Sequence, residues 1–170
     1  MQPTQQFPQP QNGKLAFGGR IDTPILGICR KRLSSEYFSP EGGTLIADGY
    51  SDPEDPSQYS AHDILSLGFK KSAKHAALLE NTAAIDKIKL ADYDGIFLTG
   101  GQSPMVTFID NAKLHKLVAD FYEVKKVVGI VCHATCVLLK TKTSDGKLIT
   151  GQQQFSGVAA AKLMIEALEV

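Results

Sequence analysis

Apolar residues form two kinds of pattern along the chain, continuous runs and helical spacing, and the clearest examples lie between residues 95 and 140. Continuous apolar runs at 95–99 and 127–131 have the length and the β-branched character of strands buried on both faces. Between them, the segment 112–123 repeats apolar residues at helical spacing, which predicts a helix on a core with Asn111 as its N-cap. The expected buried stripe consists of Leu114, Leu117, Val118, Phe121 and Tyr122. With a further helix expected at 133–140, the order of elements predicts a right-handed βαβα unit.

The remaining segments carry weaker patterns. Residues 1–12 hold three prolines, five glutamines and no charge, which predicts a disordered tail. A strand is expected at Pro24–Cys29, and the stretch 39–63 is rich in the residues that favour turns. Helical signal resumes near Ser72, and Ser156 is expected to cap a last helix.

Composition narrows the class of protein. A chain of 170 residues suits one domain with a core, and we expect a single α/β domain over 13–170. The 18 basic residues balance the 18 acidic ones, so nothing favours nucleic acid or an anionic membrane as a partner. No apolar run approaches the ~20 residues that cross a bilayer, and no secretory signal is expected. The three cysteines lack metal-type spacing, which favours free thiols, no metal and a cytoplasmic location.

The junction between the apolar run 127–131 and Cys132 is the strongest chemical signal. In a doubly wound sheet, reactive groups gather at the carboxyl ends of strands, and Cys132 stands at such an end. A strand that turns at once into a helix would hold the thiol on a sharp elbow, where amides favour the thiolate. His133 could then take a proton or orient a substrate. The Gly100-Gly101 turn after the neighbouring strand would let backbone N–H groups approach an oxyanion.

The same residues also fit a structural interpretation. Buried cysteines are common and usually inert, so the pattern alone leaves open whether Cys132 is a nucleophile. Cys136, one helical turn on, is expected to be a core thiol, and His115 is expected at the surface beside the buried stripe. The sequence at Gly100-Gly101 lacks the further glycines and the lysine of a nucleotide-binding loop, so no cofactor is expected.

Five longer segments carry a family pattern. They are "SPEGG" (39–43), "DGYSDPEDPSQYSAHDILSLGF" (48–69), "ADYDGIFLTGGQSPMVTFIDN" (91–111), "FYEVKKVVGIVCHATCVLL" (121–139) and "DGKLITGQQQFSG" (145–157). Together they resemble the ThiJ/PfpI superfamily, and within it the branch of glyoxalase III and stress chaperones. The resemblance implies a class I glutamine amidotransferase-like fold. Such a fold is a doubly wound, flavodoxin-like parallel sheet sandwiched by helices.

The resemblance also implies roles for individual residues. Cys132 becomes the nucleophile and His133 the adjacent histidine of a Cys-His-acid triad, while the backbone at Gly100 and Gly101 forms the oxyanion site. The implied reaction converts methylglyoxal to lactate without glutathione, or is a related deglycase reaction. The partner is then a small aldehyde, and a homodimer is expected because relatives often dimerise. Two alternatives stay open: an inactive member acting as a chaperone-like or interaction module, and a redox-sensing thiol protein.

The chain departs from the family pattern in two places. Residues 1–35 contain one acidic residue, Asp22, and no glutamate, so the opening strand and its glutamate-bearing helix are expected to be missing. Glu36 falls in the expected second strand and is a poor substitute. The segment 138–157 joins two separate parts of the pattern, so the block with the acidic triad member is expected to be absent and the sheet incomplete. Without that acid, His133 would lose control of its tautomer. Splicing, a gene-model error or a degenerate paralogue would each produce such a chain.

Overall fold

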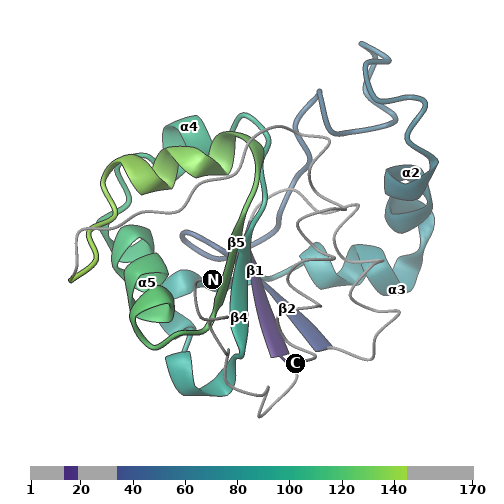
Figure 1. Cartoon of the computed structure of the whole chain (residues 1–170). Coiled ribbons are helices and arrows are strands. Elements are labelled where there is room, and N and C mark those ends of the chain that lie inside the picture. The colour runs from purple at the N-terminus through teal and green to yellow at the C-terminus, as the bar shows by residue number, and fades with distance from the viewer. Residues whose placement is uncertain (1–13, 19–33, 145–170) are drawn as a thin grey trace, which may run out of the picture.

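The computed structural model describes residues 14–18 and 34–144 (Figure 1). At its centre is a five-stranded sheet in the order β3-β2-β1-β4-β5, and every pairing is parallel. The strands are β1 (Lys14–Gly18), β2 (Ser34–Ser39), β3 (Ala83–Ala84), β4 (Gly95–Leu98) and β5 (Val127–Ile130). Because β1 lies between β2 and β4, the chain winds outward in both directions from the middle of the sheet. The predicted flavodoxin-like α/β fold is confirmed.

Helices lie on both sides of the sheet in Figure 1, with α4 and α5 on one side and α2 and α3 on the other. The α-helices are α2 (Ile64–Lys71), α3 (Ala73–Ala76), α4 (Pro104–Thr107) and α5 (Ala112–Glu123). The described residues also form 3-10 helices: η1 (Ala77–Leu79), η2 (Ile85–Lys87), η3 (Leu90–Asp92) and η4 (Cys132–Leu139). Among the described residues, no helix has both the length and the apolar character that crossing a bilayer requires.

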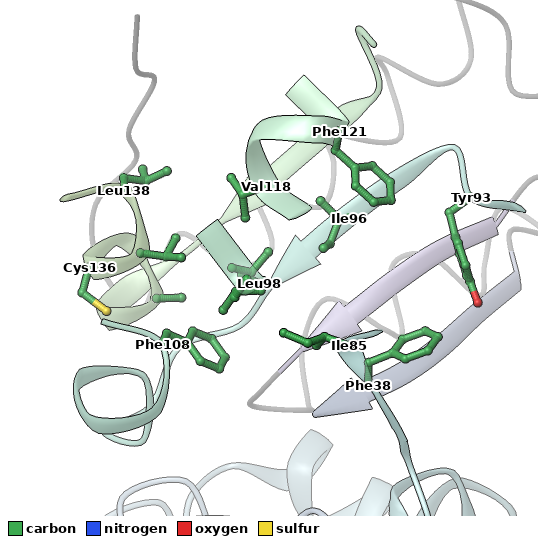
Figure 2. Packing of buried hydrophobic residues seen from close by; sticks show 13 residues of the cluster. Phe38, Ile85, Tyr93, Ile96, Leu98, Phe108, Val118, Phe121, Cys136 and Leu138 are labelled. Carbon is green, nitrogen blue, oxygen red and sulfur yellow. The ribbon is translucent and has the colours of Figure 1, made fainter. Parts of the chain in front are cut away.

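Strand β4 lies at the centre of the hydrophobic core. All four of its residues are buried, and Phe97 is 0% exposed, as expected for a parallel strand covered on both faces. Figure 2 shows Ile96 and Leu98 packed beneath Val118 and Phe121 of α5. The strands predicted at 95–99 and 127–131 are therefore present, and each ends one residue earlier than expected. Both strands end beside the candidate site.

Helix α5 has the predicted ends and the predicted cap. The Asn111 side chain accepts a hydrogen bond from the Leu114 N–H at 3.0 Å. The expectation of a surface position for His115 is wrong, because this side chain is only 8% exposed. Its Nε2 donates to the Phe108 carbonyl at 2.9 Å, so the ring is buried with a partner.

Two expectations about the first half of the chain need correction. The opening strand is not missing: β1 pairs with both β2 and β4 in the middle of the sheet. The first described helix after the turn-rich stretch begins at Ile64 rather than near Ser72, because the Asp63 side chain caps the N–H groups of Leu65 and Ser66. The predicted tail at 1–12, the strand at Pro24–Cys29 and the helix after Ser156 lie outside the described residues.

Candidate active site at the carboxyl end of β5

The chain makes a sharp elbow at Cys132. The Val131 N–H still donates to the Leu98 carbonyl at 3.1 Å, so the pairing with β4 continues up to the elbow. Cys132 then adopts φ = 56°, a left-handed backbone conformation that is uncommon for a residue with a side chain. The Thr135 hydroxyl donates to the Cys132 carbonyl at 2.8 Å and fixes the turn. The helix predicted at 133–140 is present as the 3-10 helix η4, so the side chain of Cys132 stands at a strand-to-helix junction.

The two-glycine turn after β4 lies directly against this elbow. A Cβ atom added to Gly100 would lie 2.4 Å from the Cys132 Cβ and 3.0 Å from its Sγ. Gly101 adopts φ = 97°, and an added Cβ would lie 2.7 Å from an Asp48 carboxylate oxygen. A side chain at Gly100 would meet the Cβ of Cys132, whereas one at Gly101 would be strained by the positive φ and would have to displace the Asp48 carboxylate. The structure therefore brings together Gly100, Gly101 and the half-buried Cys132 at one edge of the sheet.

His133 lies beside the sulfur and is held by the backbone. Its Nδ1 is 3.7 Å from the Cys132 Sγ and 3.1 Å from the Gly101 carbonyl oxygen. A carbonyl can only accept, so Nδ1 carries the hydrogen and donates it. The expectation that His133 loses control of its tautomer without an acid is therefore wrong, because the Gly101 carbonyl sets the tautomer. In this tautomer the single Nδ1 hydrogen is shared between the Gly101 carbonyl and the Cys132 sulfur, while Nε2 is the nitrogen that can accept a proton.

Asp48 is a site residue that the sequence analysis did not identify. It lies in the loop between β2 and α2, and its Oδ2 accepts the Gln102 N–H at 3.1 Å. Its Oδ1 accepts the Tyr50 N–H at 3.0 Å and the Ser51 hydroxyl at 2.9 Å. The carboxylate therefore fastens the loop to the two-glycine turn. An aspartate within the turn-rich stretch 39–63 was the available signal, but turn propensity alone does not identify its partner.

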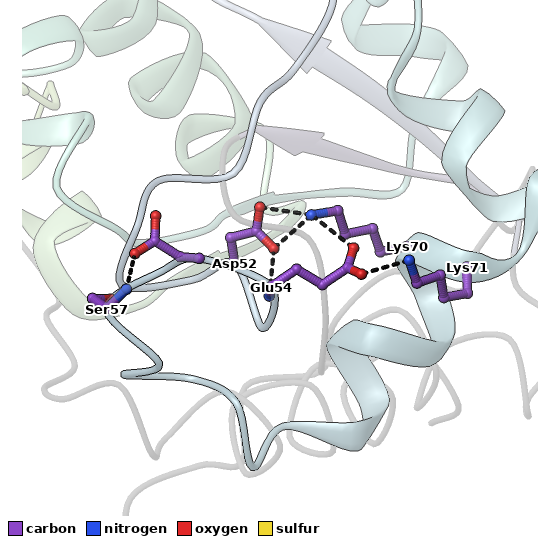
Figure 3. A network of polar contacts seen from close by, with 6 residues as sticks. Asp52, Glu54, Ser57, Lys70 and Lys71 are labelled. Atoms are coloured by element: carbon purple, nitrogen blue, oxygen red, sulfur yellow. Dashed lines mark hydrogen bonds and ion pairs between the residues drawn. The ribbon is translucent and has the colours of Figure 1, made fainter.

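A second set of contacts holds the same loop to α2 (Figure 3). Lys70 contacts Asp52 at 2.7 Å and Glu54 at 3.1 Å, and Lys71 contacts Glu54 at 2.5 Å. The hydrogen bond from Lys70 is the main reason that the pKa of Asp52 lies below its usual value. These exposed ion pairs join the loop to α2, and each contributes little energy singly.

Cys136 and Glu36 lie outside the reactive cluster. Cys136 is 7% exposed and its Sγ donates to the Pro104 carbonyl at 3.3 Å, which confirms the predicted core thiol. Burial raises the pKa of this thiol. The Glu36 carboxylate accepts the Tyr93 hydroxyl at 2.5 Å. Tyr93 precedes β4, at the opposite end of the parallel strands from Cys132, so Glu36 does not supply an acid to the site. Within residues 14–18 and 34–144, the partners of His133 are a thiol and a carbonyl.

A cysteine on a strained elbow, at the carboxyl edge of a parallel sheet and against a two-glycine turn, defines a class of α/β proteins. Comparison with known families agrees: the model of the DJ-1/PfpI family matches residues 68–166. The chain belongs to the DJ-1/PfpI family.

Relatives extend this assignment. YraA of Bacillus subtilis strain 168, whose name proposes a cysteine protease, is 29% identical over 123 residues, 67% of this chain and 72% of YraA. Protein/nucleic acid deglycase 2 of Escherichia coli K12 is 26% identical over 123 residues, 66% of this chain and 71% of the relative. Glyoxalase III from Candida albicans superposes with a TM-score of 0.67 at 14% identity, over 91% of this chain and 96% of that structure. The last likeness shows the fold alone.

Proposed function

We propose that this protein is a glutathione-independent glyoxalase, which converts methylglyoxal and related 2-oxoaldehydes to 2-hydroxy acids. The observation that carries the proposal is the position of the Cys132 sulfur, against the two-glycine turn and 3.7 Å from Nδ1 of His133. A nucleophilic thiol with a hydrogen-bond donor beside it suits addition to an aldehyde. The fold shared with glyoxalase III and the relationship to a deglycase support the same chemistry.

The reaction needs a thiol, a proton carrier and water. The Cys132 thiolate adds to the aldehyde carbon, a C–S bond forms, and the oxygen takes up a proton to give a hemithioacetal. The hydrogen on that carbon then moves as a proton to the neighbouring ketone carbon, which leaves a lactoyl thioester. Water cleaves the C–S bond, releases lactate and returns the thiol. The aldehyde carbon is oxidised as the ketone carbon is reduced, so no external oxidant or reductant is consumed.

Each described site residue has a role in this scheme. The Nδ1–H of His133 stabilises the thiolate, and its Nε2 carries the proton between the two carbons. We assign the developing oxyanion to the backbone amides of Gly101 and His133. Asp48 is a positioning residue, because it holds Gln102 and so keeps the Gly101 carbonyl against the imidazole.

A second candidate is a non-catalytic member that acts as a chaperone-like or interaction module. The observation in its favour is that the described partners of His133 include no carboxylate. This candidate predicts that suppression of client aggregation is the same in the wild type and in Cys132→Ser.

The experiment compares lactate formation from methylglyoxal, without glutathione, by the wild type, Cys132→Ser and Cys136→Ser. Cys136→Ser is the matched control, because its thiol is buried and bonded to Pro104. We expect Cys132→Ser to fall to the uncatalysed rate and Cys136→Ser to retain activity. Equal rates for the wild type and Cys132→Ser would remove the glyoxalase assignment.

A further inference from the structure

A cavity of about 530 Å³ lies beside the two-glycine turn. The loop before α2, the helices α2 and α3, and the residues at the start of α4 surround it. Its apolar wall includes Leu45, Ile46, Phe69, Leu79, Pro104 and Phe108. Ile46 is 87% exposed, so a large aliphatic side chain is open to solvent there. This volume and this lining are typical of a site for a small organic molecule rather than for a few waters.

Charges on the wall indicate what kind of molecule fits. Asp48, Asp52 and Glu80 contribute carboxylates. Lys70 supplies positive charge to the described wall, and it is already bound by Asp52 at 2.7 Å and Glu54 at 3.1 Å. A phosphate or carboxylate in the cavity would face these acids and compete for a paired lysine. An uncharged molecule would neither be repelled by these carboxylates nor need to compete for Lys70.

The cavity and the candidate nucleophile share Gly100. Gly100 lies on the cavity wall, and its Cα lies so close to Cys132 that an added Cβ would be 3.0 Å from the sulfur. Asp48 also belongs to both, because it lines the cavity and binds the turn through Gln102. A molecule seated in the cavity therefore borders the turn on which the thiol rests. Methylglyoxal carries only a methyl group beside its reacting carbonyls and would leave most of this volume unfilled.

We propose that the cavity binds a bulky, uncharged apolar group attached to the reacting carbonyl, so that aryl or branched alkyl 2-oxoaldehydes are preferred over methylglyoxal. This inference rests on the proposed function, since it assigns the substrate class of the same site. It excludes substrates in which a phosphate would lie in the cavity, such as glycated nucleotides.

A binding experiment tests the cavity without any chemistry. Benzyl alcohol and phenyl phosphate are titrated into the Cys132→Ser protein and followed by protein NMR. Ala76 lines the cavity, whereas its neighbour Ala77 is exposed and lies outside the wall, so Ala76→Phe and Ala77→Phe form a matched pair on the same background. We expect benzyl alcohol to bind the parent and Ala77→Phe, with affinity lowered about tenfold in Ala76→Phe, and phenyl phosphate not to bind. Equal binding of benzyl alcohol to both variants, or preferential binding of phenyl phosphate, would overturn the assignment.

A kinetic experiment tests the link to the thiol. We expect kcat/KM for phenylglyoxal to exceed that for methylglyoxal by about tenfold in the wild type, and the ratio to approach one in Ala76→Phe but not in Ala77→Phe. If Ala76→Phe fails to fold, Thr107→Trp fills the cavity from α4 instead. Binding without turnover of either aldehyde would disprove the glyoxalase function and leave the apolar cavity supported. Turnover with equal kcat/KM values would disprove the substrate preference alone.

Discussion

Gly100→Ala is the smallest change that should disturb the elbow. The new Cβ would lie 2.4 Å from the Cys132 Cβ and 3.3 Å from the Val131 carbonyl oxygen. Carbon atoms that are not bonded pack at ~3.5–4.0 Å, so the two chain segments must separate by roughly 1 Å. The added methyl group meets the Cβ of Cys132, which is attached directly to the backbone and cannot move away by rotation of a side chain. Relief therefore requires movement of the turn or of Cys132 itself.

The free-energy cost of this overpacking follows from the size of the added group. Forcing an extra methyl group into a packed site typically costs about 1–3 kcal/mol, which lowers the Tm of a chain of this length by ~2–12 °C. The effect on chemistry should be larger, because a displacement of about 1 Å at a reacting group can lower a rate ~100-fold. We therefore expect a folded protein with a modestly lower Tm and a strongly reduced rate at Cys132.

The assay combines thermal melting with the rate of lactate formation from methylglyoxal without glutathione. Gly68→Ala is the control, because Gly68 lies within α2 and an added Cβ there meets nothing within 4 Å. Alanine in a helix interior should raise stability by ~1 kcal/mol and leave the thiol unchanged. If Gly100→Ala matches the wild type in Tm and in the rate of lactate formation, the turn does not press on Cys132 and the site geometry is refuted.

Three further predictions concern the surroundings of the site. Asp48→Ala removes the acceptor of the Gln102 N–H and should lower lactate formation ~10–100-fold, with Asp48→Asn partly active. Asp55→Ala is the control on the same loop, because Asp55 accepts the nearby Ser57 N–H and does not line the cavity, and it should stay near wild type. Equal loss in the two alanine variants would contradict a specific role of Asp48 in positioning. Burial raises the pKa of Cys136 above its ordinary value of 9.0, so the unfolded chain releases this proton first and stability should fall as pH rises above 9.0. Urea midpoints between about pH 8 and about pH 10.5 should show that fall, and an equal fall in Cys136→Ala would refute its assignment to this thiol. His115→Leu removes one of the two donors to the Phe108 carbonyl, which keeps the Asn111 N–H at 3.1 Å, and should cost about 0.5–1.5 kcal/mol by urea unfolding. The exposed His62→Leu should be neutral, and a neutral His115→Leu would mean that the bond is not needed.

Local patterns were enough to predict the elements that frame the site. Helix α5 was predicted at its observed ends because its apolar spacing and its Asn111 cap are both contained in one short segment. The grouping of Cys132 with the two glycines was also predictable, since parallel strands that are neighbours end at the same edge of a sheet.

The remaining features depend on partners far away in the sequence. Strand β1 is only five residues long, and its central place is defined by its pairing with β2 and β4. Asp48 bonds to Gln102, 54 residues further on, so no local pattern could reveal its role. The sequence places His115 at the surface because a polar residue beside the apolar stripe of a helix usually faces solvent. Its buried ring bonds to the carbonyl of Phe108, which lies outside that helix.

The most direct test of the site is to find where the acyl group is attached during turnover. The protein is incubated with methylglyoxal without glutathione, quenched in acid, and mapped by peptide mass spectrometry for a lactoyl thioester. Such a thioester requires the proton transfer between carbons and does not arise from simple aldehyde addition to a thiol. We predict the lactoyl group on Cys132, and its absence in Cys132→Ser. A lactoyl group on Cys136, or lactate production with no acyl group on Cys132 and undiminished activity in Cys132→Ser, would contradict the account.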